Sequence, residues 1–314
     1  MTPIEKFTKK FKALDVLDIP DHGVPTIGPS RLEFKNPLNW FDPDKKPPLN
    51  PNMNLKDYLK LVVGYQDPYP IKVIDHDGVM VVRDDLLPDN LGSKIRYVDA
   101  FMSTVSQQYI FYAAVAQGHA LKVLAVSAKK YGKTVIAIAP LRKTPTPTHV
   151  EAIENGVLMM YYQSGGMSGV RKRCRDFITE FMPASGLYIP AGVKHPLIIA
   201  GFAKTCWGIN KRYKPDTVFS AASTMTMNSG IQLGFPTAEI HAIQVAGNAA
   251  SIKWPGRAII HIHDQPFDES CKEEYLPPFN SIKTYDAKAW IYAKEYKQAH
   301  PKKRVMFWNV AGQN

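Results

Sequence analysis

Cysteine is scarce in this sequence, with three residues (Cys174, Cys206 and Cys271) among 314. Their spacing fits neither a zinc site nor a disulfide framework, and free thiols suit a reducing compartment. Long apolar runs are also missing. The longest, such as TVIAIAP and HPLIIAGFA, fall well short of the roughly 20 residues of a membrane-spanning helix. No apolar signal-peptide core begins the sequence, so we expect a cytoplasmic protein.

Acidic residues are few relative to basic ones. Thirty-nine Lys and Arg against 28 Asp and Glu give a net charge of +11 and a pI near 9.3. Such an excess favours contact with nucleic acid or another polyanion, although a role in solubility alone explains it equally well. Three basic segments are scattered along the sequence: VRKRCR, which holds Arg171, Lys172 and Arg173, then NKRYK and PKKR.

The order of apolar segments predicts an α/β protein. Residues 1–60 are rich in Pro, Asn and Lys and predict an extended N-terminal arm with little regular structure. From residue 71 onward, short apolar strands alternate with amphipathic helices up to a final strand in RVMFWNVAG. This alternation predicts mainly parallel sheets flanked by helices. We expect a large domain of residues 61–95 and 200–314 and a small domain of residues 96–199.

Lys94 occupies an unusual position in the segment VVRDDLLPDNLGSKIRY. A short strand, a charge cluster and a glycine-containing turn lead directly to this lysine, where a helix is predicted to begin. Cations are not favoured at the positive end of a helix dipole. The placement therefore suggests a lysine retained for its amine, with a solvated surface lysine as the alternative.

Three other segments carry weaker signals. HIHD places His261 and His263 on one face of a strand, but no second cluster of ligands accompanies them, so we predict no metal site. SGGMSGVRKRCR has a glycine-rich turn without the spacing of a P-loop. SAASTMTMNSG follows a strand and precedes a helix, so its hydroxyls suit either a phosphate or a simple helix cap.

Five segments, in order, resemble the pyridoxal-phosphate enzymes of the tryptophan-synthase-β-like fold (fold type II), in particular the D-cysteine desulfhydrase and aminocyclopropane-carboxylate deaminase branch. The similarity covers roughly residues 65–314. The segments are VVRDDLLPDNLGSKIRY, AQGHALKVLAVSAKKYG, YIPAGVKHPLIIAGF, FSAASTMTMNSGIQLG, and TYDAKAWIY with RVMFWNVAG. The resemblance implies a two-domain protein that binds pyridoxal 5'-phosphate and forms a homodimer.

The resemblance also implies roles for individual residues. Lys94 would form the Schiff base with the aldehyde cofactor. Asp286 would face the pyridine nitrogen, and Tyr285 matches the active-site tyrosine of the deaminases. The phosphate would lie against Ser223, Thr224 and Thr226, His119 would contact the ring 3-oxygen, and Gln117, Lys194 and His195 would line the substrate.

Several positions depart from the family pattern. Gly118 and His119 replace the serine and asparagine that hold a substrate carboxylate, and Tyr97 replaces the lysine three residues after Lys94. Ser223 and Met225 stand where the phosphate loop has glycines. These changes predict that the cofactor is kept while the small amino-acid substrate is not.

We therefore predict a lyase acting on an α-amino-acid moiety, with decarboxylation slightly favoured over deamination or β-elimination. Bacteriophages that hypermodify their DNA encode enzymes resembling this fold, so the amino acid is predicted to be carried on a modified DNA base, in the host cytoplasm if the protein is viral. Two alternatives stay open: a small-molecule desulfhydrase or deaminase, and a nucleic-acid-binding pseudo-enzyme.

Overall fold

The computed structural model describes residues 50, 52–116, 118–163, 166–246 and 256–313, and all structural statements concern these residues. The helices are α2 Leu55–Leu61, α3 Lys94–Thr104, α4 Ala120–Lys130, α5 Pro147–Glu154, α6 Met167–Phe181, α7 Pro196–Tyr213, α8 Thr226–Gly234 and α9 Asp286–Ala299, with 3-10 turns η1 Asp84–Leu86, η2 Pro88–Asn90 and η4 Glu273–Tyr275. The strands are β1 Val73–His76, β2 Val79–Arg83, β3 Tyr109–Ala113, β4 Thr134–Pro140, β5 Leu158–Tyr162, β6 Gly186–Ile189, β7 Thr217–Ala222, β8 Glu239–Gln244, β9 Ile259–Ile262 and β10 Val305–Asn309.

The described residues form two compact units. The smaller unit contains residues 106–191 and the larger unit contains residues 50–105 and 192–313. These limits lie 10 and 8 residues from the predicted domain boundaries after residues 95 and 199, because α3 and α7 each belong as a whole to the larger unit. None of the helices in the described ranges is both long and apolar enough to cross a bilayer.

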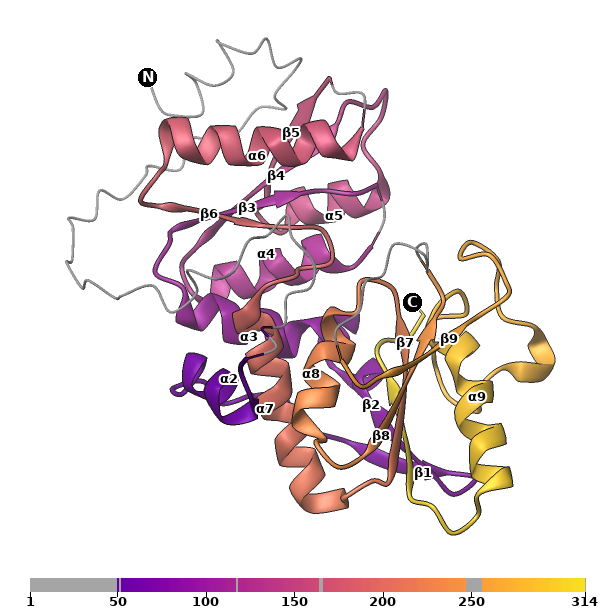
Figure 1. The fold of residues 1–314 in the computed structure, drawn as a ribbon. Coiled ribbons are helices and arrows are strands. Elements are labelled where there is room, and N and C mark those ends of the chain that lie inside the picture. Colours follow the sequence, from indigo (N-terminus) through magenta and orange to yellow (C-terminus); the bar gives the residue numbers. More distant parts are fainter. Residues whose placement is uncertain (1–49, 51, 117, 164–165, 247–255, 314) are drawn as a thin grey trace. The chain divides into compact units, whose positions relative to one another are not determined.

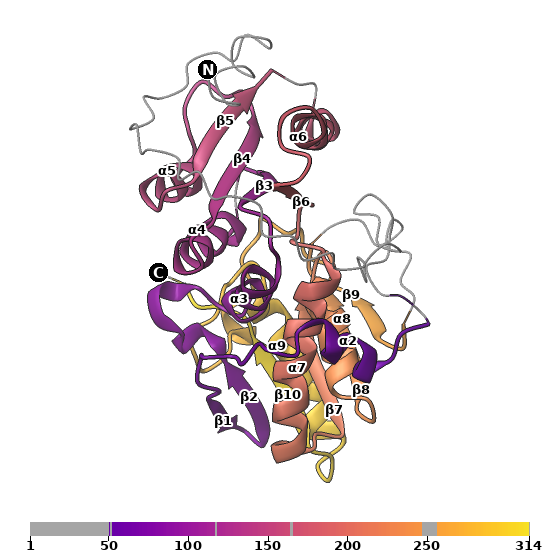
Figure 2. The ribbon, with the colours of Figure 1, turned by 90° about the vertical axis from the view of Figure 1, so that its left-hand side faces the viewer.

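The smaller unit is a parallel four-stranded sheet in the order β5-β4-β3-β6. Its strands are nearly continuous apolar runs, as expected where helices cover both faces of a sheet. Figure 2 shows α6 on one face and α4 and α5 on the other. The core beneath α6 includes Phe111, Ile138, Cys174 and Phe177, which are all buried.

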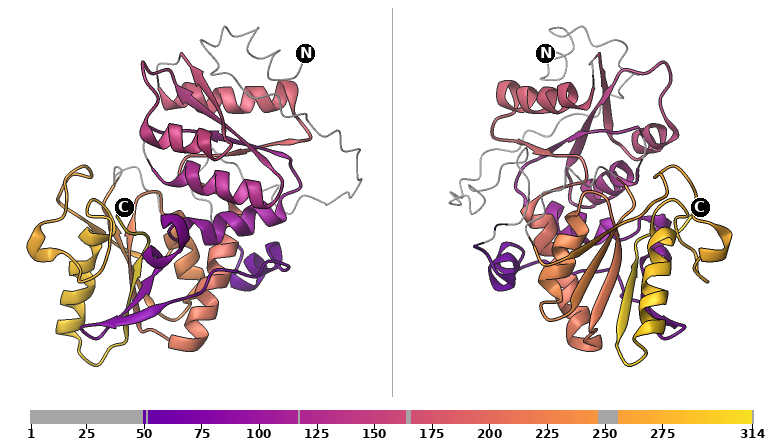
Figure 3. Two further views of the ribbon diagram at one scale, coloured as in Figure 1. Left: turned by 180° about the vertical axis from the view of Figure 1, so that it is seen from behind. Right: turned by 45° about the vertical axis from the view of Figure 1, so that its right-hand side comes forward.

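The larger unit is a six-stranded sheet in the order β1-β2-β10-β7-β8-β9, parallel except for β1. Helix α9 lies on one face, and α7 and α8 lie on the other (Figures 1 and 3). Strand β10 contributes side chains to both faces of the sheet. Phe307 packs in the cluster under α9, whereas the Trp308 ring lies against Phe202 of α7 with ring centroids 4.7 Å apart. Because all these strands except β1 run in the same direction, the residues that follow them gather along one edge of the sheet.

The sequence predicts little regular structure in residues 1–60. This prediction is wrong for residues 55–60, which belong to helix α2, and residues 1–49 lie outside the described residues. Helix α2 begins after Asn54, whose side chain accepts a hydrogen bond from the Asp57 N–H while the Asp57 carboxylate accepts one from the Asn54 N–H. This capping box satisfies two helix-terminal N–H groups at once. The buried Tyr58 then anchors α2.

Helices α3 and α7 pack closely because glycine stands at their crossing. A methyl group added at Gly201 would lie 2.3 Å from the Ala100 Cβ atom, far inside contact distance. By contrast, an added methyl at Gly208, further along α7, would have no atom within 4 Å. One helix therefore contains a glycine required by packing and a glycine that packing does not require.

We predict opposite effects of alanine at these two positions. Gly201→Ala should lower the free energy of unfolding by about 1–3 kcal/mol, because the two helices must move apart. Gly208→Ala should raise it by about 0.5–1 kcal/mol, because alanine favours a helix interior over glycine. Urea unfolding of both variants measures this, and changes of the same sign would contradict the packing argument.

Candidate functional site

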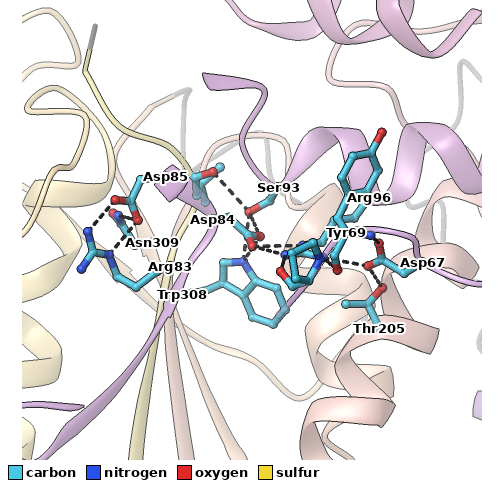
Figure 4. Close-up of polar contacts among 12 residues, drawn as sticks. Asp67, Tyr69, Arg83, Asp84, Asp85, Ser93, Arg96, Thr205, Trp308 and Asn309 are labelled. Atoms are coloured by element: carbon cyan, nitrogen blue, oxygen red, sulfur yellow. Dashed lines mark hydrogen bonds and ion pairs between the residues drawn. The ribbon is translucent and has the colours of Figure 1, made fainter. Parts of the chain in front are cut away.

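A fully buried arginine, Arg96, organises the larger unit where β2 leads into α3 (Figure 4). Its guanidinium donates from Nε (3.0 Å) and Nη2 (2.7 Å) to Asp84 Oδ1, and from Nη1 to Asp67 Oδ2 at 3.0 Å. It also donates to the carbonyl oxygens of Tyr69 and Pro70. Thr205 of α7 donates to the same Asp67 oxygen at 2.8 Å. Arg96 therefore joins η1, α3, α7 and the segment before β1.

Asp84 also holds the residue that precedes Lys94. Its Oδ2 atom accepts hydrogen bonds from Ser93 Oγ at 2.6 Å and from Trp308 Nε1 at 2.9 Å. The Ser93 N–H donates to the Val310 carbonyl oxygen at 2.8 Å. Gly92 has φ +62°, and a Cβ there would lie 2.6 Å from the same oxygen, so this turn requires glycine. Together these contacts fix the start of α3.

Lys94 and Asp286 are the central titratable pair. Lys94 is half-buried at the first position of α3, and desolvation lowers its pKa, opposed by the charge of Asp286. Asp286 begins α9 and is fully buried. Burial raises the pKa of Asp286 to about 8, despite the Ala311 N–H that donates to Oδ2 at 3.3 Å and the nearby Lys94. Its Oδ1 atom makes no hydrogen bond to a described residue.

Two tyrosines adjoin this pair. Burial raises the pKa of Tyr285 well above its usual value, and the Asp286 charge adds to the shift. Tyr97 is buried against Phe202, with ring centroids 5.2 Å apart. Burial likewise raises the pKa of Tyr97, with further contributions from Tyr285 and Asp286. Both phenols are therefore neutral at physiological pH and able to donate a hydrogen bond.

The predicted phosphate-binding hydroxyls follow β7. Thr224 Oγ1 and Thr226 Oγ1 lie 3.2 Å apart at the start of α8, and Thr226 Oγ1 donates to the Gly192 carbonyl oxygen at 2.9 Å. A Cβ at Gly192 would lie 2.5 Å from Thr224 Cγ2, so the chain passes close to this turn. Ser223 is half-buried, and its carbonyl oxygen accepts from Gln244.

Met225 adopts φ +62° within this turn, a conformation that favours glycine. The turn therefore has the backbone shape of a glycine-rich loop even though a buried methionine occupies it. A strained residue held by its surroundings is frequent at functional sites.

Lys194 and His195 are the two predicted substrate residues that follow Gly192. In the structure, His195 caps the N-terminus of α7. Its Nδ1 atom accepts from the Leu197 N–H at 3.2 Å and caps α7, and its ring lies 5.0 Å from that of Phe101. Burial lowers the pKa of His195 to about 3, so the ring is neutral. Lys194 is half-buried. Substrate contact by either residue stays a prediction.

The remaining predicted site residues belong to the smaller unit. His119 is half-buried and precedes α4, whereas Gln117 lies outside the described residues. Arg171, Lys172 and Arg173 lie on α6, where Lys172 and Arg173 form ion pairs with Asp176 at 2.8 and 3.9 Å. Arg173 also lies 4.7 Å from the centre of the Tyr162 ring. These contacts engage part of the basic charge of α6.

The histidines of HIHD make other contacts. His261 Nε2 lies 2.8 Å from His241 Nδ1, and His241 Nε2 lies 2.6 Å from Glu239 Oε1. His263 Nδ1 lies 3.3 Å from the Tyr292 hydroxyl. Among the described residues, no three or more His, Cys, Asp or Glu side chains are arranged to hold a metal ion.

Sequence reasoning missed Arg96 as part of this site, and it named Tyr97 only as a departure from the family pattern. The signal for Arg96 was a charged residue among apolar ones near the start of a helix, two positions after the key lysine. The burial of Tyr97 beside Tyr285 and Asp286 depends on segments almost 200 residues apart, and no local pattern announces it.

We predict a pH-dependent stability from Asp286 in the protein without cofactor. Its carboxyl is protonated in the folded state up to a pKa of about 8 but ionises near 3.8 when unfolded. Between pH 5 and 7 the folded state thus binds one more proton, and stability falls as pH rises, by up to about 1.4 kcal/mol per pH unit. Asp286→Asn should remove this part of the slope in urea unfolding measured from pH 5 to 7.

The control is Asp57→Asn. The Asp57 carboxylate is partly exposed and accepts a hydrogen bond from the Asn54 N–H, which is the main cause of its lowered pKa, so it stays ionised across this range in both states. The pH slope of this variant should match that of the wild type. An unchanged slope in Asp286→Asn would show that the carboxyl is ionised in the folded protein.

No family profile and no curated protein sequence matches the chain. Solved structures do match. An ACC deaminase homologue aligns with a TM-score of 0.65 at 16% identity, covering 81% of this chain and 94% of its own. Threonine deaminase isoform 2 from Solanum lycopersicum gives 0.63 at 16% identity, covering 83% and 90%. A pyridoxal 5'-phosphate-dependent aspartate racemase gives 0.60 at 13% identity, covering 84% and 96%.

Each of these alignments covers more than four fifths of this chain. The α/β fold expected from the sequence is thus confirmed: the chain has the tryptophan-synthase-β-like fold, fold type II.

Proposed function

We propose that the protein is a pyridoxal-phosphate-dependent lyase acting on an α-amino-acid moiety. The observation that carries the proposal is the pairing of the half-buried Lys94 with the buried Asp286, whose carboxyl has one oxygen without a hydrogen-bond partner among the described residues. The fold neighbours, which include deaminases and a pyridoxal 5'-phosphate-dependent racemase, support it.

The side chains present fit this cofactor. An unpaired buried oxygen is costly, and a pyridine nitrogen facing Asp286 Oδ1 would satisfy it. With a pKa of about 8, the carboxyl is protonated near neutral pH, so it would be able to donate a hydrogen bond to such a nitrogen. The Thr224 and Thr226 hydroxyls and the N-terminus of α8 would bind the phosphate, with Ser223 beside them. His119 would meet the ring 3-oxygen.

When bound, pyridoxal phosphate supplies an electron sink for the bond that breaks at the substrate α-carbon. The chain's own groups would do the rest. Lys94 Nζ, held by the fixed start of α3, would bind the cofactor covalently and, once released, return a proton to the α-carbon. Its lowered pKa favours the neutral amine that the covalent bond to the cofactor requires, and it makes the protonated form a stronger acid for the return of the proton. Tyr285 would donate its phenolic proton in a hydrogen bond, because its pKa is raised.

Decarboxylation is the favoured reaction. Related sites hold the substrate carboxylate with a serine and an asparagine, and this chain has Gly118 and His119 at those positions. Without that serine and asparagine, the substrate carboxylate would be able to turn to the orientation in which its bond to the α-carbon breaks. Gln117, Lys194 and His195 would then contact other parts of the substrate.

The substrate is proposed to be an amino acid attached to a DNA base. The net charge of +11 supports this proposal, because a polyanionic substrate benefits from a basic protein. A second candidate is a deaminase acting on a free amino acid, favoured by the structural similarity to the ACC deaminase homologue and by the adjacent Tyr285 and Asp286.

The first test is cofactor attachment. Protein reconstituted with pyridoxal phosphate should absorb near the edge of the visible range, and borohydride should fix the cofactor on Lys94, as located by peptide mapping. Lys288 is the internal comparison, because it is buried and desolvation lowers its pKa as it lowers that of Lys94, but its amine donates to the Pro266 carbonyl oxygen. Labelling of Lys288 instead, or no uptake of cofactor, would overturn the assignment.

The second test is the reaction itself. Protein loaded with cofactor should release CO2 faster than ammonia from a DNA-linked amino acid. It should release CO2 more slowly from the free amino acid than from the DNA-linked one. Asp286→Asn should retain the cofactor absorbance and lower turnover about 10²–10³-fold, a loss typical of removing an electrostatic partner. Ammonia release from free D-cysteine or aminocyclopropane carboxylate, without CO2 from the DNA-linked substrate, would instead establish the second candidate.

A further inference from the structure

A basic pocket lies at the edge of the larger sheet opposite to Lys94. Its volume is about 570 Å³, and its lining includes Trp207, Lys211, Lys214, Lys303 and Arg304. These residues come from the end of α7 and from the turn before β10 (Figure 1), at the amino ends of the parallel strands. Two of the three basic sequence segments, NKRYK and PKKR, thus meet at one place although about 90 residues separate them.

The charge in the basic pocket is unbalanced. Asp216 is its one acidic lining residue, and Arg304 engages it with an Nη2–Oδ1 distance of 3.1 Å. The ammonium groups of Lys211, Lys214 and Lys303 form no salt bridge with a described residue. Lys211 lies 5.3 Å from the centre of the Trp207 ring. The lining therefore carries a surplus of three positive charges, four cations less one carboxylate.

Helix electrostatics explains only part of this surplus. Cations complement the negative end of a helix dipole, which accounts for Lys211 near the end of α7. It does not account for Lys303, which comes from the turn before β10. The field of Lys303 reaches carboxylates nearby and contributes to the lowered pKa values of Asp216 and Glu239, after their hydrogen bonds to Arg304 and His241.

Lys214 carries a second indication that the charge is retained for a ligand. It caps α7 with φ +45° and ψ +57°, the left-handed conformation in which glycine or asparagine is favoured. A lysine there is less favourable for folding than glycine. Because its side chain is exposed and lines the basic pocket, binding is a reason to keep it.

We propose that the basic pocket binds the phosphates of a nucleic-acid strand. A single phosphate is usually held by converging backbone N–H groups at a helix N-terminus, whereas α7 and α8 both direct their C-terminal ends toward this pocket. Flexible lysines around an open, aromatic-lined hollow instead suit a polyanion, whose binding is driven by release of counterions.

This site is independent of the proposed lyase chemistry. Six-residue strands separate the two edges of the sheet, roughly 20 Å at about 3.3 Å per residue. Substitutions in the basic pocket should therefore leave cofactor absorbance and turnover of a free amino acid unchanged, so that a failure of this inference is distinguishable from a failure of the proposed function.

The test is a titration of a fluorescein-labelled 20-nucleotide single-stranded DNA, followed by anisotropy at several salt concentrations. The triple variant Lys211→Ala, Lys214→Gly, Lys303→Ala should reduce the slope of log affinity against log salt by about 2, from three lost phosphate contacts at about 0.7 each. At 0.1 M salt this corresponds to a loss of affinity on the order of 100-fold.

The matched control removes three other exposed lysines through Lys56→Ala, Lys129→Ala and Lys143→Ala. This control should bind DNA with nearly the wild-type slope. Equal losses in both triple variants would assign binding to diffuse charge and overturn the inference, as would absence of binding at low salt. Tripolyphosphate that competes as well as DNA, at equal phosphate concentration, would show a site for small polyphosphates instead.

Lys214→Gly alone separates binding from folding. It should weaken DNA binding several-fold while raising the melting temperature by about 1–2 °C, because glycine relieves the left-handed conformation. A purely structural lysine would give the opposite result, with lower stability and unchanged binding.

Discussion

The larger unit depends on the buried ion pair between Arg96 and Asp84. With both side chains fully buried, removal of either partner would leave an uncompensated charge, a loss of about 3–5 kcal/mol. The buried pair is stable because both carboxylate oxygens of Asp84 and all three guanidinium nitrogens of Arg96 have hydrogen-bond partners. Since Ser93 is one of those partners, the same network that neutralises the charge also fixes the backbone next to Lys94.

One sheet thus presents two chemically different edges. At the carboxyl ends of the strands, burial brings a lysine, an aspartate and two tyrosines to unusual proton affinities. At the amino ends, lysine and arginine side chains line an open hollow. The parallel direction of β2, β10, β7, β8 and β9 produces this separation, because the segments that leave these strands lie at one edge and the segments that enter them lie at the other.

Local patterns were sufficient to predict the α/β architecture and the strand, turn and helix around Lys94. Apolar periodicity and glycine placement are properties of neighbouring residues, so they can be recognised in the sequence. The capping box of α2 was equally legible, yet the surrounding Pro and Asn residues obscured it. The burial of Arg96, the left-handed Met225 and the meeting of Lys211 with Lys303 arise from contacts between distant segments. No single stretch of sequence contains that information.

The hydrogen bond from Trp308 to Ser93 spans 215 residues and has a consequence for biosynthesis. The four strands of the smaller unit occupy a continuous stretch, residues 109–189, and are able to pair while the chain is still growing. Strand β2, in contrast, must wait for β10, which at ordinary translation rates emerges roughly 10–40 s later. Until then Asp84 and Arg96 lack their covering layer, so the surroundings of Lys94 are among the last parts of the molecule to form.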